Sequence, residues 1–275
     1  MDTATALLEE TALAKEERLK TLVASYGGLA VAYSGGVDST YLSDVAHDLL
    51  GSRARILLGD SPSIPRSEVR EALDLARERG WNFEVLFTNE FTNDAYLAND
   101  GTRCYHCRTE LFSKMRAYAE QTGIAVLAYG EITDDLVDST RLGARAAKEL
   151  AVVAPLVEVR MTKAEIRILS TRRKLPTADK ASFACLSSRF PVGTRVTLED
   201  LKKIEQAEEA LKRLGFHQYR ARHHGNLCRI EVDPEDVSRL VDPAVRDALV
   251  AAITEAGYRY VTLDLAGYRT GSTAG

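Results

Sequence analysis

Residues 34–39, Ser-Gly-Gly-Val-Asp-Ser, have the side-chain types and the spacing that hold a phosphate group. They follow an apolar run at residues 28–33 and precede a helical pattern at residues 40–50. In this order, backbone N–H groups and the amino end of the helix face a bound anion. The glycines lack Cβ atoms that would block a close approach, and the serines add hydroxyl donors. An ordinary turn between a strand and a helix is the structural alternative. The predicted phosphate ligands are Ser34, Gly35, Gly36 and Ser39.

An acidic residue in this loop suggests a metal ion. The chain contains no G-x-x-x-x-G-K-S/T sequence, so the loop is not a Walker loop. Asp38 lies where it could hold Mg²⁺ against a pyrophosphate, whose charge the metal must neutralise. An acid also suits this position without a metal, because the helix dipole favours negative charge in the first turn. Asp134 and Asp135 follow a later predicted strand, and they suit either metal binding or local capping.

Three of the four cysteines have a placement that suits metal chemistry. Cys104 and Cys107 follow a predicted turn at residues 100–102 and begin a helix, where thiolates are favoured. Cys185 lies in a later loop that we expect to leave the same edge of the sheet. Three thiolates suit a [4Fe-4S] cluster with one open iron. The sequence therefore favours a cluster on these three residues.

Other uses of the thiols remain open. A structural zinc site would need a fourth ligand, for which His106 or Cys228 could serve. A disulfide, a redox pair or inert cysteines would also suit a lone Cys-x-x-Cys. Cys228 alternates with polar Arg229 and Glu231 in a predicted strand, so we expect it to be a core residue.

Two further segments carry candidate substrate ligands. Ser188 and Arg189 lie beside Cys185, and we expect both to line the substrate, with Ser188 among the catalytic residues. Arg220 and Arg222 alternate along one predicted strand, so both side chains face the same way. Two guanidinium groups on one face suit the phosphate of a nucleotide. A solvated strand face is the alternative.

The composition excludes several classes of protein. At 275 residues, the chain can bury a core and form one or two domains. Its net charge of −4 gives no general attraction to nucleic acid or to an anionic membrane. No apolar run approaches the ~18 residues of a membrane span, and the acidic, amphipathic N-terminus predicts a helix rather than a signal peptide. Four cysteines do not suggest a secreted disulfide scaffold, so we expect a cytoplasmic protein with reduced thiols.

Strands and helices alternate along the first part of the chain. This pattern predicts an α/β fold with a doubly wound, mainly parallel sheet. Ligands of such sheets bind beyond the carboxyl ends of the strands, where the phosphate loop lies. We expect strands at residues 28–33, 53–58, 82–87, 125–129 and 152–153, and helices at residues 40–50, 65–80, 104–121, 139–150 and 161–174.

The pattern changes after this region. Residues 176–195 show no periodicity, and a loop of this length is typical of a functional segment. We therefore divide the chain into a domain at residues 1–175 that carries the phosphate loop, the long loop at residues 176–195, and a smaller α+β domain at residues 196–275. The elements expected in the smaller domain are a helix at residues 197–214, a hairpin at residues 218–222 and 227–232, a helix at residues 243–256 and a strand at residues 258–265.

Several segments together resemble the LarE family, within the PP-loop ATP pyrophosphatase superfamily. The phosphate loop matches the PP-loop and indicates only the superfamily. The resemblance covers nearly the whole chain, from about residue 30 to residue 267. Residues 184–193 and 258–267 point to LarE itself. The other segments of the resemblance are Cys104-Tyr-His-Cys107 and residues 130–135 and 141–145, and Glu131-Ile132 depart from the usual family pattern.

The resemblance implies an ATP-dependent sulfur transferase that makes the organic part of the nickel-pincer nucleotide, the cofactor of lactate racemase. LarE proteins adenylylate a carboxylate of pyridinium-3,5-biscarboxylic acid mononucleotide, a small-molecule nucleotide, and replace an oxygen by sulfur. Arg220 and Arg222 match the arginines that bind the substrate phosphate, and Glu208 and Glu231 match acidic positions near that site. The family assembles into homo-oligomers.

Two sulfur donors are known in the family. One type sacrifices the sulfur of a loop cysteine, and the other passes on a sulfide bound to the free iron of a three-cysteine [4Fe-4S] cluster. The sacrificial cysteine aligns with Ala184 of this chain, and the sacrificial type lacks the pair Cys104 and Cys107. Both differences favour the cluster type, which needs an external source of sulfide. Sacrifice of Cys185 is the alternative.

Three other functions compete with this one. A tRNA thiolation enzyme also joins a PP-loop to a three-cysteine cluster, but the net charge of −4 and the absence of zinc-ribbon cysteine pairs stand against it. An ammonia-using amide synthetase, like NAD synthase, would have no use for the cysteines. A nucleotide-sensing or electron-carrier module would bind ATP without making pyrophosphate.

Overall fold

The computed structural model describes residues 3–137, 142–181 and 184–269, and its contacts divide the chain into two compact units. The first unit takes its residues from 1–61, 66–90 and 104–182. The second takes them from 62–65, 91–103 and 183–275. Two short segments from the first half of the chain thus belong to the second unit, which the alternation of strands and helices did not indicate.

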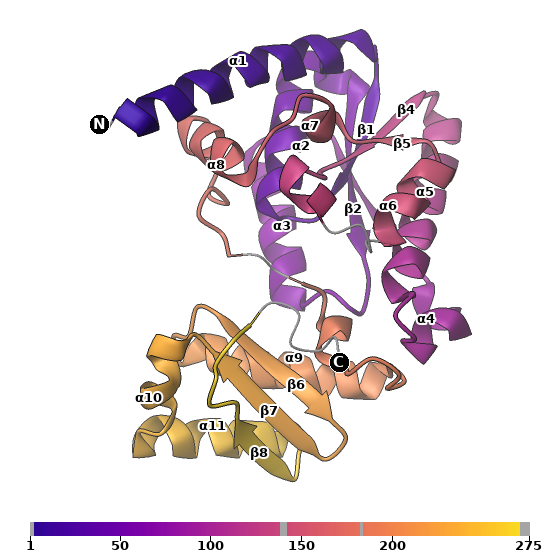
Figure 1. The fold of residues 1–275 in the computed structure, drawn as a ribbon. Coiled ribbons are helices and arrows are strands. Elements are labelled where there is room, and N and C mark those ends of the chain that lie inside the picture. The colour runs from indigo at the N-terminus through magenta and orange to yellow at the C-terminus, as the bar shows by residue number, and fades with distance from the viewer. Residues whose placement is uncertain (1–2, 138–141, 182–183, 270–275) are drawn as a thin grey trace. The chain divides into compact units, whose positions relative to one another are not determined.

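A five-stranded, all-parallel sheet forms the centre of the first unit (Figure 1). The strand order is β3-β2-β1-β4-β5, so β2 and β3 lie on one side of β1, and β4 and β5 lie on the other. Such a reversal of strand order between β1 and β4 is the usual ligand site of an open α/β sheet, and the phosphate loop follows β1. The strands are β1 (Leu29–Tyr33), β2 (Ala54–Asp60), β3 (Phe83–Phe87), β4 (Val126–Tyr129) and β5 (Val152–Val153).

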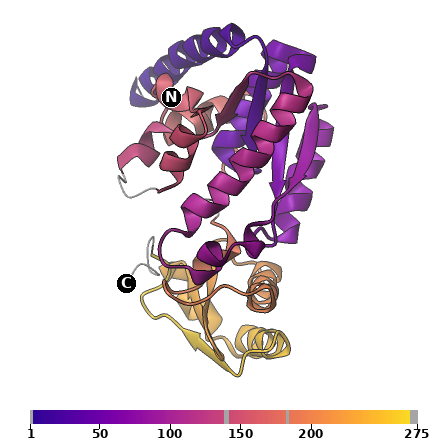
Figure 2. The ribbon, with the colours of Figure 1, turned by 90° about the vertical axis from the view of Figure 1, so that its right-hand side faces the viewer.

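Helices cover both faces of this sheet (Figure 2). Helices α2 and α3 lie on one face, and α5 and α6 lie on the other. Phe112, Met115 and Ala146 of α5 and α6 are at most 1% exposed, because they pack on the apolar side chains of β1, β2 and β4. The bounds of these helices are α2 (Val37–Leu50), α3 (Arg66–Glu78), α5 (Arg103–Thr122) and α6 (Leu142–Glu149).

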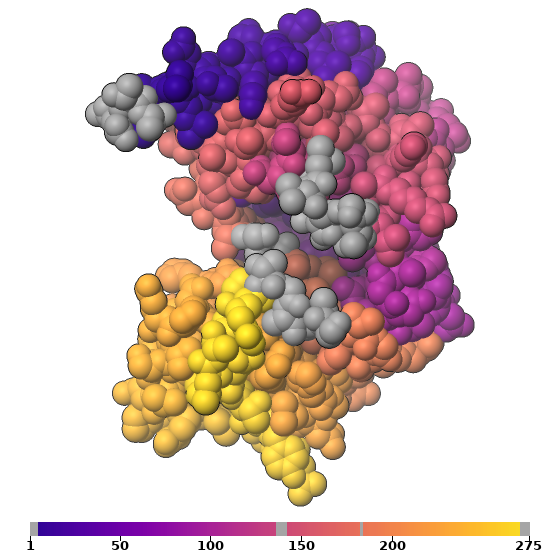
Figure 3. Space-filling view, in the orientation of Figure 1, coloured from indigo at the N-terminus to yellow at the C-terminus, as the bar shows by residue number. Residues whose placement is uncertain are grey.

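Helix α1 (Thr3–Ser25) packs along α8 (Lys163–Arg172) on the outside of the first unit. In the space-filling view, α1 is the indigo band that covers the red-coloured segments of this unit (Figure 3). Lys15 Nζ lies 2.7 Å from a carboxylate oxygen of Glu165 and anchors the two helices. The expected N-terminal helix is therefore present, and it covers α8.

The second unit is a three-stranded sheet with helices on one face. Strands β6 and β7 are antiparallel, and β8 pairs with β7 in parallel. Cys228 of β7 is fully buried in this core, as expected, and burial raises the pKa of its thiol to about 12. The elements are α9 (Leu198–Arg213), β6 (Tyr219–His224), β7 (Leu227–Val232), α10 (Val237–Leu240), α11 (Pro243–Glu255) and β8 (Tyr260–Leu263).

The expected α/β class, with a parallel sheet and a small second sheet, is confirmed. The sequence pattern missed α4 (Asp94–Ala98), α7 (Pro155–Glu158) and α10, because helices this short show no full period. Residues 139–141 of an expected helix and residues 182–183 of the expected loop lie outside the described residues. The short 3-10 helices are Gly51–Arg53, Glu90–Thr92, Thr133–Val137, Leu186–Arg189 and Pro234–Asp236.

None of the helices within residues 3–137, 142–181 and 184–269 has the length and apolar character needed to cross a membrane.

Candidate active site

The phosphate loop connects β1 to α2 at the carboxyl edge of the parallel sheet. Gly36 is the N-cap of α2 and adds no side chain over the first N–H groups of the helix, which suits an anion. The hydroxyls of Ser34 and Ser39 lie 3.0 Å apart. Gly35 has a φ of +73°, and a Cβ there would lie 3.0 Å from Ala72 Cβ. A glycine therefore suits this position, because it has no Cβ and adopts a positive φ without strain.

Strand β4 ends directly against this loop. A Cβ on Gly130 would lie 2.8 Å from the backbone nitrogen of Ser39, a distance that real Cβ atoms do not reach. A glycine is therefore required where the chain leaves β4. The close approach brings the end of β4 to the loop that follows β1, at the reversal of strand order.

Asp38, in the first turn of α2, forms an ion pair with Lys163, the first residue of α8. Lys163 Nζ lies 2.7 Å from Asp38 Oδ1. Burial raises the pKa of the Asp38 carboxyl, and Asp135 adds to the rise, whereas Lys163 opposes it. The backbone N–H of Lys163 donates to Asp134 Oδ2 at 2.6 Å, which fixes the start of α8. Asp38 is thus a carboxylate held beside a cation at the phosphate loop.

A cavity of about 300 Å³ borders the loop at Gly35. Its other walls come from Tyr33, from α3 and from residues 176–180. Three carboxylates and one lysine line it, and the lysine already pairs with Glu68 and Glu71. This excess of negative charge is unfavourable for a triphosphate. The phosphates of ATP therefore have no favourable place in the cavity.

The cysteines divide into three accessible thiols and one buried thiol. Cys104 is exposed and Cys107 is half-buried, and they lie one turn apart at the start of α5. Cys185 is half-buried directly before a 3-10 helix, whereas Cys228 is buried in the apolar core of the second unit. Three accessible thiols match the donor set of a cluster with one open iron.

Convergence of the three thiols stays a prediction. Cys104 and Cys107 belong to the first unit and Cys185 to the second. Among the residues that the structure describes, no three His, Cys, Asp or Glu side chains form a group that could hold a metal ion.

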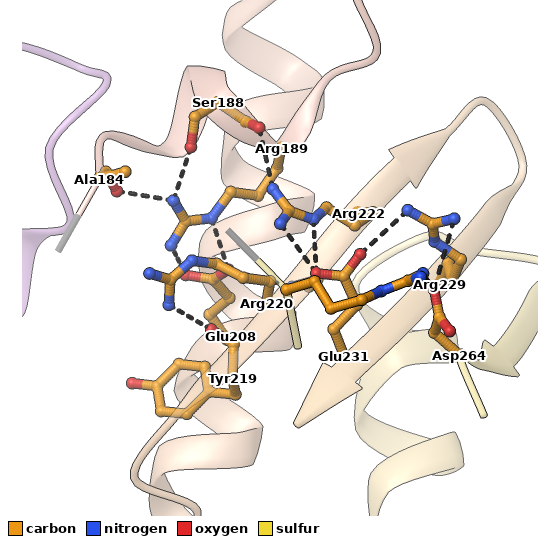
Figure 4. A network of polar contacts seen from close by, with 12 residues as sticks. Ala184, Ser188, Arg189, Glu208, Tyr219, Arg220, Arg222, Arg229, Glu231 and Asp264 are labelled. Atoms are coloured by element: carbon orange, nitrogen blue, oxygen red, sulfur yellow. Dashed lines mark hydrogen bonds and ion pairs between the residues drawn. The ribbon is translucent and has the colours of Figure 1, made fainter. Parts of the chain in front are cut away.

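Arg189 lies at the centre of a polar network in the second unit (Figure 4). Its guanidinium forms a two-point ion pair with Glu208, with N–O distances of 2.7 and 2.8 Å. It also donates to the carbonyl oxygens of Ala184 and Cys185, at 2.6 and 3.1 Å, and to Ser188 Oγ at 2.8 Å. The side chain is 0% exposed, and the Glu208 pair outweighs burial and raises its pKa. Arg189 therefore fixes the shape of the loop around Cys185.

The two strand arginines face the same side of β6, as the alternation predicted (Figure 4). Arg222 donates to Glu231 at 2.8 and 3.0 Å and to the carbonyl oxygen of Ser188 at 3.1 Å. The guanidinium carbon of Arg220 lies 4.8 Å from the centre of the Tyr268 ring. Burial, followed by the charge of Arg189, lowers the pKa of Arg220.

The alternative of a solvated strand face is wrong. Arg220 and Arg222 are 6% and 4% exposed, and Glu208 and Glu231 are 5% and 0% exposed. Buried charges must be paired, and each carboxylate here has an arginine partner. The four residues form a charged interior rather than a wet surface. Their role as substrate ligands stays a prediction.

Proteins of known sequence match the chain over most of its length. A pyridinium-3,5-bisthiocarboxylic acid mononucleotide synthase from Lactiplantibacillus plantarum is 33% identical over 256 residues, or 91% of each chain. This chain belongs to the LarE family. An uncharacterised protein from Synechocystis is 40% identical over 259 residues, which cover 93% of this chain and 96% of that protein. A comparison with models of protein families found no match.

Membership in the LarE family confirms the resemblance but leaves the sulfur donor open, because the name of the relative specifies its product and no sulfur donor. The sequence analysis missed Lys163 as the partner of Asp38. A signal for it existed, since Thr162 and Glu165 form a capping box that starts a helix at Lys163. Nothing in the sequence indicated that this helix start would meet the phosphate loop.

The buried pair predicts a large loss of stability when one partner is removed. Arg189→Met should lower the free energy of unfolding by about 3–5 kcal/mol, because Glu208 is left as an unpaired buried charge. Urea titration followed by circular dichroism measures the change. The control is Arg195→Met, whose partner Asp94 is 89% exposed and whose loss should cost about 0–1 kcal/mol. Equal effects of the two substitutions would contradict the structural role of Arg189.

Proposed function

We propose that this protein is an ATP-dependent sulfur transferase that converts a carboxylate of pyridinium-3,5-biscarboxylic acid mononucleotide into a thiocarboxylate. The observation that carries the proposal is the match to the pyridinium-3,5-bisthiocarboxylic acid mononucleotide synthase over 91% of the chain. The phosphate loop at the reversal of the sheet supports the use of ATP. The product belongs to the synthesis of the nickel-pincer nucleotide.

The first step activates the carboxylate. A carboxylate oxygen of the substrate attacks the α-phosphorus of ATP, the bond to the β-phosphate breaks, and pyrophosphate leaves with the bonding electrons. The N-terminus of α2 and the hydroxyls of Ser34 and Ser39 would bind the leaving pyrophosphate. Asp38 would hold Mg²⁺, which neutralises phosphate charge. Lys163, which pairs with Asp38 in the structure, would move to a phosphate oxygen.

The second step inserts sulfur. A hydrosulfide attacks the activated carbonyl carbon, AMP leaves with the oxygen, and the thiol proton goes to solvent. We propose that Arg220 and Arg222 bind the phosphate of the substrate. Ser188, whose hydroxyl and carbonyl oxygens both accept from arginines, would contact the reacting carboxyl group. Arg189 would contribute by holding Ser188 and Cys185 in place.

We propose that the sulfur donor is a sulfide bound to an iron–sulfur cluster. Cys104, Cys107 and Cys185 would hold a [4Fe-4S] cluster, which supplies an open iron that can carry sulfide. The accessibility of these three thiols and the burial of Cys228 support this donor set. Sacrifice of Cys185 itself is the alternative. We also propose that the protein forms a homo-oligomer, as the family does.

ATP chemistry gives the first functional prediction. With ATP, Mg²⁺ and the pyridinium dicarboxylate nucleotide, the protein should release pyrophosphate and AMP. Asp38→Asn should lower the rate of pyrophosphate release by about 100-fold or more, because the metal loses its protein ligand. A coupled pyrophosphate assay measures the rate, and Asp74→Asn, at a carboxylate that is 74% exposed, is the control. Release of phosphate instead of pyrophosphate would remove the PP-loop assignment.

The ion pair of Asp38 and Lys163 predicts a shift in pH dependence. Burial raises the pKa of Asp38 and Lys163 opposes that rise, so loss of the lysine charge raises the pKa further. Because Mg²⁺ needs the carboxylate, Lys163→Met should move the acid limb of kcat/KM to higher pH. Lys163→Arg should leave the limb close to that of the wild type. A slower Lys163→Met enzyme with an unmoved acid limb would show that Lys163 does not act through Asp38.

The cysteines give a prediction about the sulfur source. Substitution of Cys104, Cys107 or Cys185 by alanine should lower both iron content and sulfur transfer, whereas Cys228→Ala should spare both. Anaerobic iron and sulfide analysis and product chromatography measure these quantities. The intact mass should show no loss of about 34 Da after turnover, the change expected when a cysteine gives up its sulfur as H₂S. Activity in the iron-free protein, together with this mass loss, would identify Cys185 as the donor.

A further inference from the structure

The loop that carries Cys185 is bound to the segment that leads into Cys104. Both lie in the second unit, which includes residues 91–103 and the described part of residues 183–275. Backbone hydrogen bonds run from Gly193 N to Asn99 O at 2.7 Å and from Val196 N to Leu97 O at 2.9 Å. The two segments are far apart in the sequence, but they form one hydrogen-bonded structure.

Asn99 is the centre of this contact. It has a φ of +51°, in the left-handed region, and it is 2% exposed. Its amide group donates to the carbonyl oxygens of Pro191 and Thr194, at 2.8 and 3.2 Å, and its side-chain oxygen accepts from Arg103. A buried amide whose donors and acceptor are all used holds its neighbours in a defined position.

Tyr96 and Arg103 bind the part of the loop closest to Cys185. The hydroxyls of Tyr96 and Ser187 lie 2.8 Å apart, and these residues are 1% and 0% exposed. Arg103 Nη1 donates to the carbonyl oxygen of Ser187 at 2.7 Å. Ser187 is two residues after Cys185. A charged donor makes the stronger kind of hydrogen bond.

Arg103 is also the first residue of α5, the helix that carries Cys104 and Cys107. A peptide bond joins it to Cys104, so their Cα atoms are about 3.8 Å apart. Arg103, which precedes the cysteine pair, is thus hydrogen-bonded to Ser187, which lies two positions after Cys185. A chain held in this way cannot move Cys185 far from Cys104 without breaking these bonds.

We propose that Tyr96, Asn99 and Arg103 are positioning residues that limit the separation between Cys185 and Cys104. They form a tether that keeps the loop cysteine within reach of the pair on α5. The inference deepens the proposed function, because it explains how thiols distant in the sequence come to serve one site. The tether itself needs no bound cluster, so it can be tested in the iron-free protein.

The test measures how readily the two thiols are joined. In iron-free protein carrying Cys107→Ser, a short bismaleimide should crosslink Cys104 to Cys185 within one chain, and peptide mass spectrometry identifies the product. Adding Arg103→Met should lower this crosslinking rate by about tenfold, because the loop loses a charged hydrogen bond and its neighbour. Tyr96→Phe should lower the rate less but in the same direction. Dilution of the protein separates crosslinks within a chain from those between chains.

Arg195→Met is the matched control, since Arg195 lies in the same loop region and its ion pair with Asp94, which is 89% exposed, should contribute little. It should leave the crosslinking rate unchanged. Circular dichroism shows whether each variant keeps its fold, and Tyr96→Phe decides the question if Arg103→Met unfolds. Rates that are equal in all folded variants and in the parent would overturn the proposal. Iron analysis of the wild-type protein tests the cluster separately. If the wild-type protein binds no iron but the crosslinking rates change as expected, the cluster is rejected and the tether is retained.

Discussion

The buried charge of Arg189 constrains the whole loop around Cys185. A guanidinium that is 0% exposed has no water to satisfy it, so each donor needs a protein acceptor. Glu208 on α9 supplies the opposite charge, and two loop carbonyl oxygens and one hydroxyl supply the rest. Glu208 is fixed in space because α9 and β6 pack on a common core. The ion pair and hydrogen bonds of Arg189 therefore hold the conformation of the loop, which has little regular structure of its own.

A second constraint comes from the way α5 begins. Its first residue, Arg103, belongs with the second unit by its contacts, whereas its remaining residues belong with the first. Residues 91–103 are the connection between β3 and α5, and in a simple α/β protein they would only link a strand to a helix. Here they contain α4 and the left-handed Asn99, and they hold residues 186–196. The connection has therefore become part of the second unit.

The sequence predicted the parallel sheet well because apolar strands and amphipathic helices alternate with strong periodicity. It also predicted correctly that the segment with Gly35 and Gly36 forms the turn between β1 and α2, because two glycines after a buried strand favour a turn. It could not predict the partners of the charged residues. Lys163 lies 125 positions from Asp38, and Arg189 lies 19 positions from Glu208. Such pairs depend on how elements pack, and no local pattern contains that information.

The pairing of Asp38 with Lys163 also determines what can bind at the phosphate loop. The two side chains are 18% and 38% exposed, and they neutralise each other. If Asp38 binds Mg²⁺ as proposed, Mg²⁺ alone would displace Lys163 and leave it close to a divalent cation. ATP alone would draw Lys163 away and leave Asp38 facing four phosphate charges. Either state leaves like charges close together in a partly buried site, which is costly. On the same proposal, Mg²⁺ and ATP arriving as one complex would give each charged group a partner, so we expect the site to favour the complex over either ligand alone.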